Sequence, residues 1–198
     1  MYYKMTFDMD IIDKTISEGK NYIYAETTNM DEIETENCKK GWFDNIILSN
    51  KGIKEWPIVE FYYSSQASNR ESDYLLNVKS WPIVHTRVTE ALKEIKGIKF
   101  YPIKLVDIVT NIVNTNYFLM YIDNFIDAFD MKKSQYRYNE KYNLYTFVPK
   151  RIFLNYEICS HYDIFRCEKS VAGIYVSSVF FNIIQENNFT GFKFDEQL

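Results

Sequence analysis

Four residues near the end of the chain belong to types that bind metal ions. Cys159, His161, Asp163 and Cys167 all have odd numbers, so in one extended strand their side chains would share a face. Cysteine and histidine are common zinc ligands. Such a strand would span about 26 Å, too far for one ion, and the spacing matches no zinc signature. We therefore expect a buried histidine and buried cysteines, and no metal ion.

Three aspartates form a second group. Asp123, Asp127 and Asp130 are spaced so that they would lie on one face of a helix. Paired carboxylates can act as general acid and base, or can bind Mg²⁺. The alternative is that they cap and shape turns after a preceding strand, and we favour it. An enzyme or a small-molecule-binding domain would instead use Asp123, Asp127 and His161, and would bring them together in one deep pocket.

Local motifs for nucleophilic or phosphate chemistry are missing from the sequence. His85 and His161 are the only histidines, no serine lies in a GxSxG motif, and the six glycines form neither a GxGxxG motif nor a Walker loop. A site assembled in space needs no such motif. The sequence still favours a protein that is not an enzyme, and it predicts no catalytic residue and no cofactor.

The composition is that of an ordinary globular protein, with 46% hydrophobic and 25% charged residues. Three cysteines, an odd number without a CxxC pair, are typical of a reducing compartment. The first residues lack the charged and apolar regions of a signal peptide, and the apolar stretches are too short to span a bilayer. We expect a cytoplasmic protein with no membrane partner.

Aromatic residues are unusually frequent, with 17 Tyr and 15 Phe. Tyrosine-rich surfaces favour protein recognition, because the ring gives a large contact area at a low cost in entropy. The same excess arises from an AT-rich coding sequence, which also enriches Ile, Lys and Asn. The aromatic content therefore permits a recognition surface without locating it.

Charge is unevenly distributed along the chain, although the net charge is only −4. Residues 1–36 contain nine acidic and three basic side chains, a net charge of −6. Residues 132–151 contain six basic side chains and one acidic side chain, a net charge of +5. A chain that is acidic overall is not expected to bind nucleic acid. The acidic stretch at 31–36 can steer a basic protein partner, or it can be a solvated loop.

Two similar strand–helix–strand units are predicted. The first has a strand at 81–85, a helix at 87–96 and a strand at 98–103; the second has a strand at 173–176, a helix ending at Asn187 and a strand at 192–194. Thr86 and Ser177 are the expected N-caps, and aligning them matches Val88 with Val179 on the apolar helix faces. Gly97 is expected to end the first helix. The units are either equivalent modules or a chance likeness between two capped amphipathic helices.

Most of the rest of the chain is predicted to form strands. We expect a strand at 2–7 and a short helix at 10–20, then strands at 117–122, 144–148, 151–156 and 162–167. Strands outnumber helices and occur in runs, which predicts an α+β fold: a mainly antiparallel or mixed sheet with a few short helices. We expect a single domain over residues 1–198, with a possible N-terminal subregion at 1–70.

Several short motifs stand out: Ile164-Phe165-Arg166, Val176-Ser177, Thr190-Gly191 and Phe192-Lys193-Phe194, with Ser72-Asp73-Tyr74, residues 83–92, Tyr101-Pro102-Ile103 and residues 126–130 with Ser134 upstream. Together they resemble the motifs of a bacterial immunity-protein family associated with polymorphic toxin systems. The similarity is strongest over residues 73–194. In the family's usual pattern a serine stands where this chain has His85-Thr86. The resemblance transfers no catalytic residue.

The resemblance implies a cytoplasmic protein that binds a cognate toxin and blocks it. We expect a stoichiometric inhibitor that is a monomer or a weak homo-oligomer. The expected contact residues are four acids and two aromatic anchors: Asp31, Glu32, Glu34 and Glu36, with Tyr136 and Tyr138 elsewhere. An accessory protein that self-associates through an aromatic surface is a further alternative.

Overall fold

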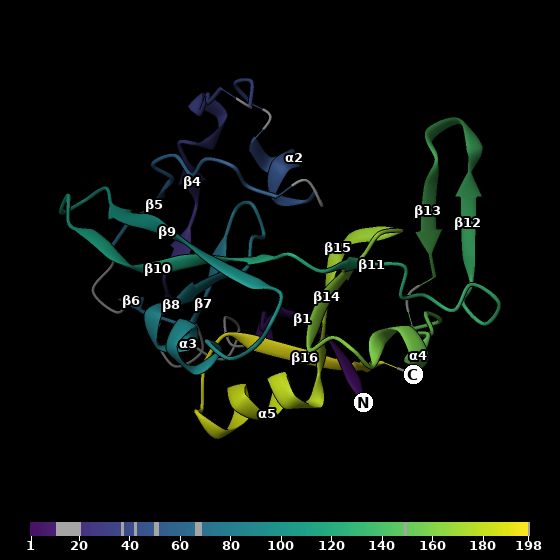
Figure 1. Cartoon of the computed structure of the whole chain (residues 1–198). Helices are drawn as coiled ribbons and strands as arrows, with labels where there is room; N and C mark the ends of the chain where they lie inside the picture. Colours follow the sequence, from purple (N-terminus) through teal and green to yellow (C-terminus); the bar gives the residue numbers. More distant parts are fainter. Residues whose placement is uncertain are drawn as a thin grey trace.

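The fold was analysed in a computed structural model, shown in Figure 1. The structure describes residues 1–10, 21–36, 38–41, 43–49, 52–65, 69–148 and 150–197. Most of the helix expected at residues 10–20 lies outside the described residues. Within the described part, no helix is long and apolar enough to cross a membrane.

Two mixed sheets form most of the molecule. The seven-stranded sheet has the order β3-β7-β8-β10-β9-β5-β4 and the five-stranded sheet the order β11-β14-β15-β1-β16. The strands are β1 (Tyr2–Phe7), β2 (Asn21–Tyr22), β3 (Tyr24–Ala25), β4 (Thr27–Thr28), β5 (Glu60–Tyr63), β6 (Asn69–Arg70), β7 (Tyr74–Asn77), β8 (Ile83–His85), β9 (Ile98–Asp107), β10 (Val113–Ile122), β11 (Phe125–Ile126), β12 (Tyr136–Asn139), β13 (Leu144–Phe147), β14 (Ile164–Cys167), β15 (Ser170–Ser177) and β16 (Phe192–Gln197).

The helices are short. They are α2 (Phe43–Ile47), α3 (Thr86–Ala91), α4 (Tyr156–Cys159) and α5 (Ser178–Glu186), with 3-10 turns η1 (Met30–Glu32) and η2 (Glu140–Tyr142). The prediction of a sheet-rich α+β fold with mixed or antiparallel strands is confirmed.

Alternation along the strands creates three hydrophobic cores. In β10, Tyr117, Leu119 and Tyr121 face the first core, which is covered by α2 and η1, whereas Met120 and Ile122 face a central core between the two sheets. In β14, Ile164 faces the central core and Phe165 faces a third core on the far side of the five-stranded sheet. This period of two is what a strand buried on both faces requires.

The helices α3 and α5 complete the central core. Val88 and Leu92 of α3, and Phe180 and Ile184 of α5, are fully buried there. Val179 is 53% exposed, so its predicted place on the apolar helix face is wrong. The buried face of α5 is defined by Phe180 and Ile184, which are four residues apart and point to the central core. Val179 lies one position earlier in the helix and therefore beside this buried face, not on it.

Two segments of the chain have the same arrangement. The strands of β8–α3–β9 flank β10, and the strands of β15–α5–β16 flank β1; in each case the middle strand is antiparallel to both neighbours. The registers also agree: Tyr117 pairs with His85 and Ile122 with Ile98 in the first, and Tyr2 pairs with Ser177 and Phe7 with Phe192 in the second. These registers support an equivalence between the segments, which stays a prediction.

The helix caps correct the internal alignment. Ser177 is the N-cap of α5, as predicted, and its Oγ accepts hydrogen bonds from the N–H groups of Val179 and Phe180. In α3 the N-cap is His85, whose side chain accepts from the Arg87 N–H, so the prediction of Thr86 as N-cap is wrong. His85, not Thr86, therefore corresponds to Ser177. The helix also ends earlier than predicted, with Leu92 as its C-cap rather than at Gly97.

A glycine at positive φ opens the return strand of each segment. Gly97 has φ +86° and Gly191 has φ +87°. The Gly97 carbonyl accepts the N–H of Asp123, and the Gly191 carbonyl accepts the N–H of Asp8, each aspartate following its middle strand. Only glycine adopts this conformation without strain.

The loop that contains Gly191 joins the two sheets. The Tyr74 N–H donates to the Thr190 carbonyl, and the Asp73 carboxylate accepts from the Thr190 N–H and Oγ1. A Cβ added to Gly191 would lie 2.5 Å from the Tyr74 carbonyl oxygen. The backbones therefore approach as closely as the absence of a side chain allows.

The close approach predicts a large loss of stability for Gly191→Ala. We expect about 2–4 kcal/mol less free energy of unfolding, because the strain of positive φ adds to a clash with backbone that cannot rotate away. Gly41→Ala is the matched control, since Gly41 has φ +77° and nothing within 4 Å of its added Cβ. That variant should lose only about 1 kcal/mol. Urea unfolding measures both, and equal losses would show that the contact with Tyr74 contributes nothing.

Candidate interaction site

The cysteine and histidine group predicted from the sequence does not share a strand. Cys159 lies in α4, His161 follows it in a turn and Cys167 lies in β14. The strand expected at residues 151–156 is also absent, because Leu154 forms only an isolated bridge and α4 starts directly afterwards. The prediction of a common strand face is therefore wrong. His161 is exposed, so the expectation that it is buried is wrong as well.

The cysteines are buried thiols, as predicted. Cys159 and Cys167 are fully buried in the third core. Burial raises the pKa of Cys159 to about 12 and also raises the pKa of Cys167. A nucleophilic cysteine needs the opposite shift. Among the described residues, no three His, Cys, Asp or Glu side chains are grouped so that they could hold a metal ion.

The aspartate group is dispersed and paired. The Asp123 carboxylate lies 2.6 Å from the Lys99 Nζ, and Asp127 forms an ion pair with Lys169. Burial disfavours the charged form of Lys169 and so lowers its pKa. The hydrogen bond from Lys169 to Asp127 and the attraction between their opposite charges together have the larger effect, and the pKa of Lys169 is raised overall. Asp130 accepts hydrogen bonds from two following N–H groups, so its predicted role in a turn is confirmed.

The residues of the enzymatic alternative are not brought together in a pocket. Three clefts are lined by described residues at 143–145 with 168–172, at 145–147 with 194–197, and at 71–73 with 188 and 190, and Asp123, Asp127 and His161 line none of these three. The helical face on which three aspartates would align is absent too, because β11 and a turn occupy that stretch. That alternative therefore has no geometric support in the described part of the chain.

The acidic segment is exposed, but its charge is partly balanced. Its four acids, Asp31, Glu32, Glu34 and Glu36, are all exposed, at η1 and after it. Asp31 lies 3.4 Å from the Lys79 Nζ. Lys39 and Lys40 follow in the chain and are exposed as well. The segment therefore offers less net negative charge than its sequence indicates.

A two-stranded arm projects from the body at the other end of the molecule (Figure 1). We define the arm as residues 136–147, that is β12, η2 and β13. Its two strands pair with each other and with no other strand of the described part of the chain. At the tip Asn143 has φ +48°, the left-handed conformation that closes the turn. The six acidic and aromatic residues predicted as contacts thus lie on two surfaces, the acidic segment and the arm.

One face of the arm is a ladder of aromatic rings. Tyr136 is paired with Phe147 and Tyr138 with Tyr145, so all four side chains share a face. The ring centroids of Tyr138 and Tyr145 are 4.6 Å apart, and those of Tyr136 and Phe147 are 5.7 Å apart. A lone hairpin is marginal in water. The ladder stabilises it, and Phe147 anchors it to Phe129 of the third core at 4.6 Å.

Half of this face consists of residues expected from the sequence to contact a partner. Tyr136 and Tyr138 were expected anchors, and they are 39% and 45% exposed. Tyr145 and Phe147 were missed as their partners. The signal was present in the sequence as two alternating aromatic pairs, Tyr-x-Tyr and Tyr-x-Phe, separated by a polar turn.

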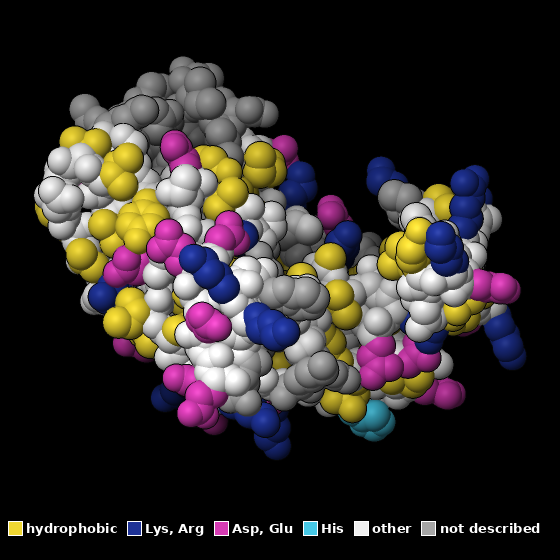
Figure 2. All heavy atoms as spheres, turned by 90° about the horizontal axis from the view of Figure 1, so that it is seen from above, with side chains coloured by type: hydrophobic (Ala, Val, Ile, Leu, Met, Phe, Trp, Pro, Cys, Tyr) yellow, Lys and Arg dark blue, Asp and Glu magenta, His cyan; other side chains and the backbone are white. Residues whose placement is uncertain are grey.

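The arm and its root are basic. Figure 2 shows dark blue Lys and Arg side chains beside yellow hydrophobic ones on the projecting part. Lys132, Arg137 and Lys150 are exposed and form no ion pair with any described residue. Lys133 pairs with Asp130, and Arg151 donates to the Gln135 side chain. Most of the positive charge of this stretch is therefore available to a partner.

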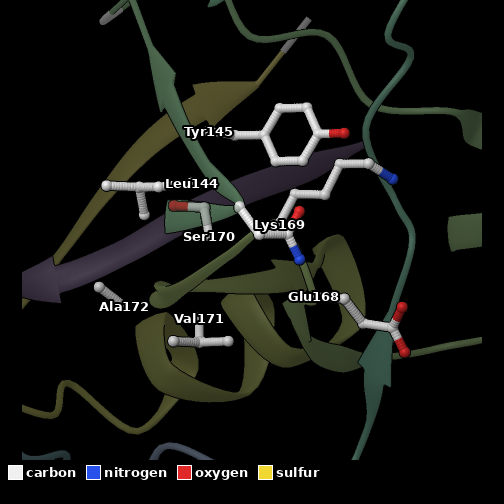
Figure 3. A pocket seen from close by; sticks show the side chains of 8 residues that line it. Leu144, Tyr145, Glu168, Lys169, Ser170, Val171 and Ala172 are labelled. Atoms are coloured by element: carbon white, nitrogen blue, oxygen red, sulfur yellow. The ribbon is translucent and has the colours of Figure 1, made fainter. Parts of the chain in front are cut away.

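Two clefts separate β13 from the body. The smaller, of about 420 Å³, lies between Asn143–Tyr145 of the arm and residues 168–172; Figure 3 shows Tyr145 beside Lys169, whose Nζ is 5.8 Å from the ring centroid. The larger, of about 860 Å³, lies between Tyr145–Phe147 and the face of β16. Both include Tyr145 and Ser170. The inner side of the arm is therefore open along β13.

These features define a class of protein: an α+β scaffold that carries an exposed arm with aromatic and basic side chains. The comparison with known families agrees. The model of the Immunity protein family (Imm11) matches residues 7–198, and the chain belongs to this family. A search of curated proteins found no match.

The aromatic anchor predicts that Phe147→Ala loosens the arm alone. Loss of the contact with Phe129 should lower the local stability of β12 and β13 by about 1–2 kcal/mol. Amide hydrogen exchange of these strands should then be about tenfold faster or more, while β10 keeps its protection. Leu144→Ala is the control, because Leu144 lies on the opposite face and is 55% exposed. Equal exchange in both variants would contradict the anchoring role.

Proposed function

We propose that this protein neutralises a cognate toxin by binding it in a stoichiometric complex. The observation that carries the proposal is the family match over residues 7–198. The proposal includes a cytoplasmic location in a bacterial cell, no catalytic step, and neither nucleic acid nor membrane as a partner. It holds that the free protein is a monomer or a weak homo-oligomer.

The arm and the acidic segment support a mechanism by binding. Both present exposed side chains that contribute little to the three cores. Tyrosine on a rigid strand gives contact area without a large loss of entropy on binding. Acidic side chains on a turn accelerate the encounter with a partner of opposite charge. A protein that acts by occupying its partner needs no reactive group of its own.

Co-expression tests the proposal. Cells that make the toxin encoded by the neighbouring open reading frame should survive only when this protein is also made. Purified components should form a complex with a fixed ratio, read by light scattering after size exclusion, and protection should saturate at that ratio. Protection at far lower ratios would indicate a catalytic mechanism and contradict the proposal. So would a lack of both complex and rescue.

The acidic segment predicts a modest effect on the association rate. The variant reverses Asp31, Glu32, Glu34 and Glu36 to Lys. We expect the association rate constant for the toxin to fall about threefold at 20 mM salt and to recover at high salt, because screening removes long-range attraction. The effect is modest because nearby lysines already balance part of the charge.

A matched control separates this local effect from net charge. It reverses four exposed acids elsewhere, Glu55, Glu90, Glu94 and Glu186, and so changes the net charge equally. Stopped-flow mixing measures both variants. If the control slows association as much as the acidic-segment variant does, the segment has no specific part in the encounter.

A further inference from the structure

We infer that the arm is the principal toxin-binding element and that it enters an acidic cleft on the toxin. The inference rests on the proposed function and adds the chemistry of the partner. Its basis is the juxtaposition of an aromatic face and an open inner side on one projecting element, with unpaired positive charge on that element and at its root.

Shape is the first argument. The arm pairs with no other described strand, and two clefts lie between β13 and the body, so that part of its inner side is open. A partner can therefore close around the arm from both sides rather than meet one flat face. Long projecting loops on antibodies and nanobodies insert into concave surfaces in the same way. The complementary surface on the toxin is then a cleft.

The rings supply the binding energy. Tyr136 and Tyr138 are partly exposed on the same face as Tyr145, and Tyr142 at the tip is 66% exposed. Aromatic residues that are held in place by their neighbours are typical anchors of protein interfaces. The arm is preordered by its own ring contacts, so binding orders few additional side chains.

The positive charge around the arm indicates the chemistry of the surface that it binds. Residues 132–151, the arm with its root, contain six basic side chains and one acidic side chain, Glu140; among the described residues only Lys133 of the six basic ones forms an ion pair. In the acidic segment, by contrast, Asp31 is paired and two lysines follow closely. The arm together with its root is therefore the surface with the larger uncompensated charge. Oppositely charged surfaces attract each other in the encounter, which assigns carboxylates to the toxin cleft.

A single-stranded nucleic acid would also meet basic and aromatic side chains. The chain as a whole has a net charge of −4, which repels a polyanion at distances beyond the arm. Acidic side chains also lie near the root: Glu168 lines the smaller cleft, and Asp195 and Glu196 line the larger. These features favour a local acidic patch on a protein over a continuous phosphate backbone.

Charge reversal on the arm and at its root tests the inference. The arm variant carries Lys132→Glu, Arg137→Glu and Lys150→Glu, and the matched control carries Lys54→Glu, Lys93→Glu and Lys96→Glu at exposed positions away from the arm. We expect the association rate constant with the co-expressed toxin to fall at least tenfold for the arm variant at 20 mM salt, and to differ by less than about twofold at 300 mM. The control should fall less than about threefold. Equal effects in the two variants, or faster association of the arm variant, would overturn the inference.

A shortened arm gives an independent test. Residues 138–145 are replaced by Asn-Gly, which closes a two-residue turn between the paired Arg137 and Thr146 and leaves the contact between Phe147 and Phe129 in place. Circular dichroism and an unchanged melting transition verify that the body is folded. We expect dissociation from the toxin at least a hundredfold faster and loss of rescue. Rescue and dissociation like those of the unaltered protein would contradict the inference.

Two readouts separate the ways of failing. If the unaltered protein binds and neutralises the toxin while the arm variants match their control, only the role of the arm is wrong. If the unaltered protein forms no complex, the proposed function itself fails. Fluorescence anisotropy with a labelled 20-nucleotide single-stranded RNA should show no binding; micromolar binding that the arm variant abolishes would identify a nucleic-acid arm instead.

Discussion

The close approach of Gly191 to the backbone of Tyr74 is the contact on which the architecture depends. It brings the loop before β16 against the first residue of β7, so that a strand of one sheet is hydrogen-bonded to the entry of the other. Asp73 then satisfies the Thr190 N–H and hydroxyl, which would otherwise be polar groups without partners beside the core. With the sheets at this spacing, α3 and α5 can both bury their apolar stripes in the central core.

The two similar segments explain why one core can serve both sheets. Each segment presents a strand, an N-cap, a short helix and a glycine turn in the same register around a middle strand. In both cases the middle strand comes from elsewhere in the chain: β1 begins the chain yet lies between β15 and β16, and β10 follows β9. The ends of the chain are thereby held in one sheet, because β1 and β16 are neighbours. The motifs that carry the family resemblance belong to this scaffold. Arg166 illustrates it, since it is buried in β14 and donates to the Val171 carbonyl rather than reaching a surface.

Elements with strong local signals could be predicted from the sequence. Elements whose structure depends on pairing or packing with distant residues could not. The Ser177 cap was predictable because a hydroxyl before an apolar helix satisfies free N–H groups. At His85-Thr86 two candidates stand side by side, and only the pairing of His85 with Tyr117 selects the first. The stretch at 151–156 has the composition of a strand, yet its only strand pairing among the described residues is the isolated bridge between Leu154 and Phe129, with scattered backbone hydrogen bonds to residues 128–135. Strand propensity measures how well a residue fits an existing sheet, and it does not supply the neighbouring strands.

The acidic residues at 31–36 were recognised in the sequence as a run of like charge. Lys79, which balances the charge of Asp31, is distant in the chain, so this ion pair could not be predicted.

The separation of scaffold from arm has a physical consequence for specificity. The three cores and the glycine loop tolerate few changes, because backbone contacts and close packing fix them. The arm contacts the body through Phe147, beside Phe129, and through Tyr145, beside Lys169. Tyr136, Arg137 and Tyr138 are exposed, so substitutions there alter a surface without removing a core residue. In the proposed binding mode this division lets the contact surface change while the fold stays constant. The same division places the scaffold residues among the recognisable motifs and the arm outside them. Shared motifs therefore identify the family, and in the proposed binding mode the charge and rings of the arm select the partner.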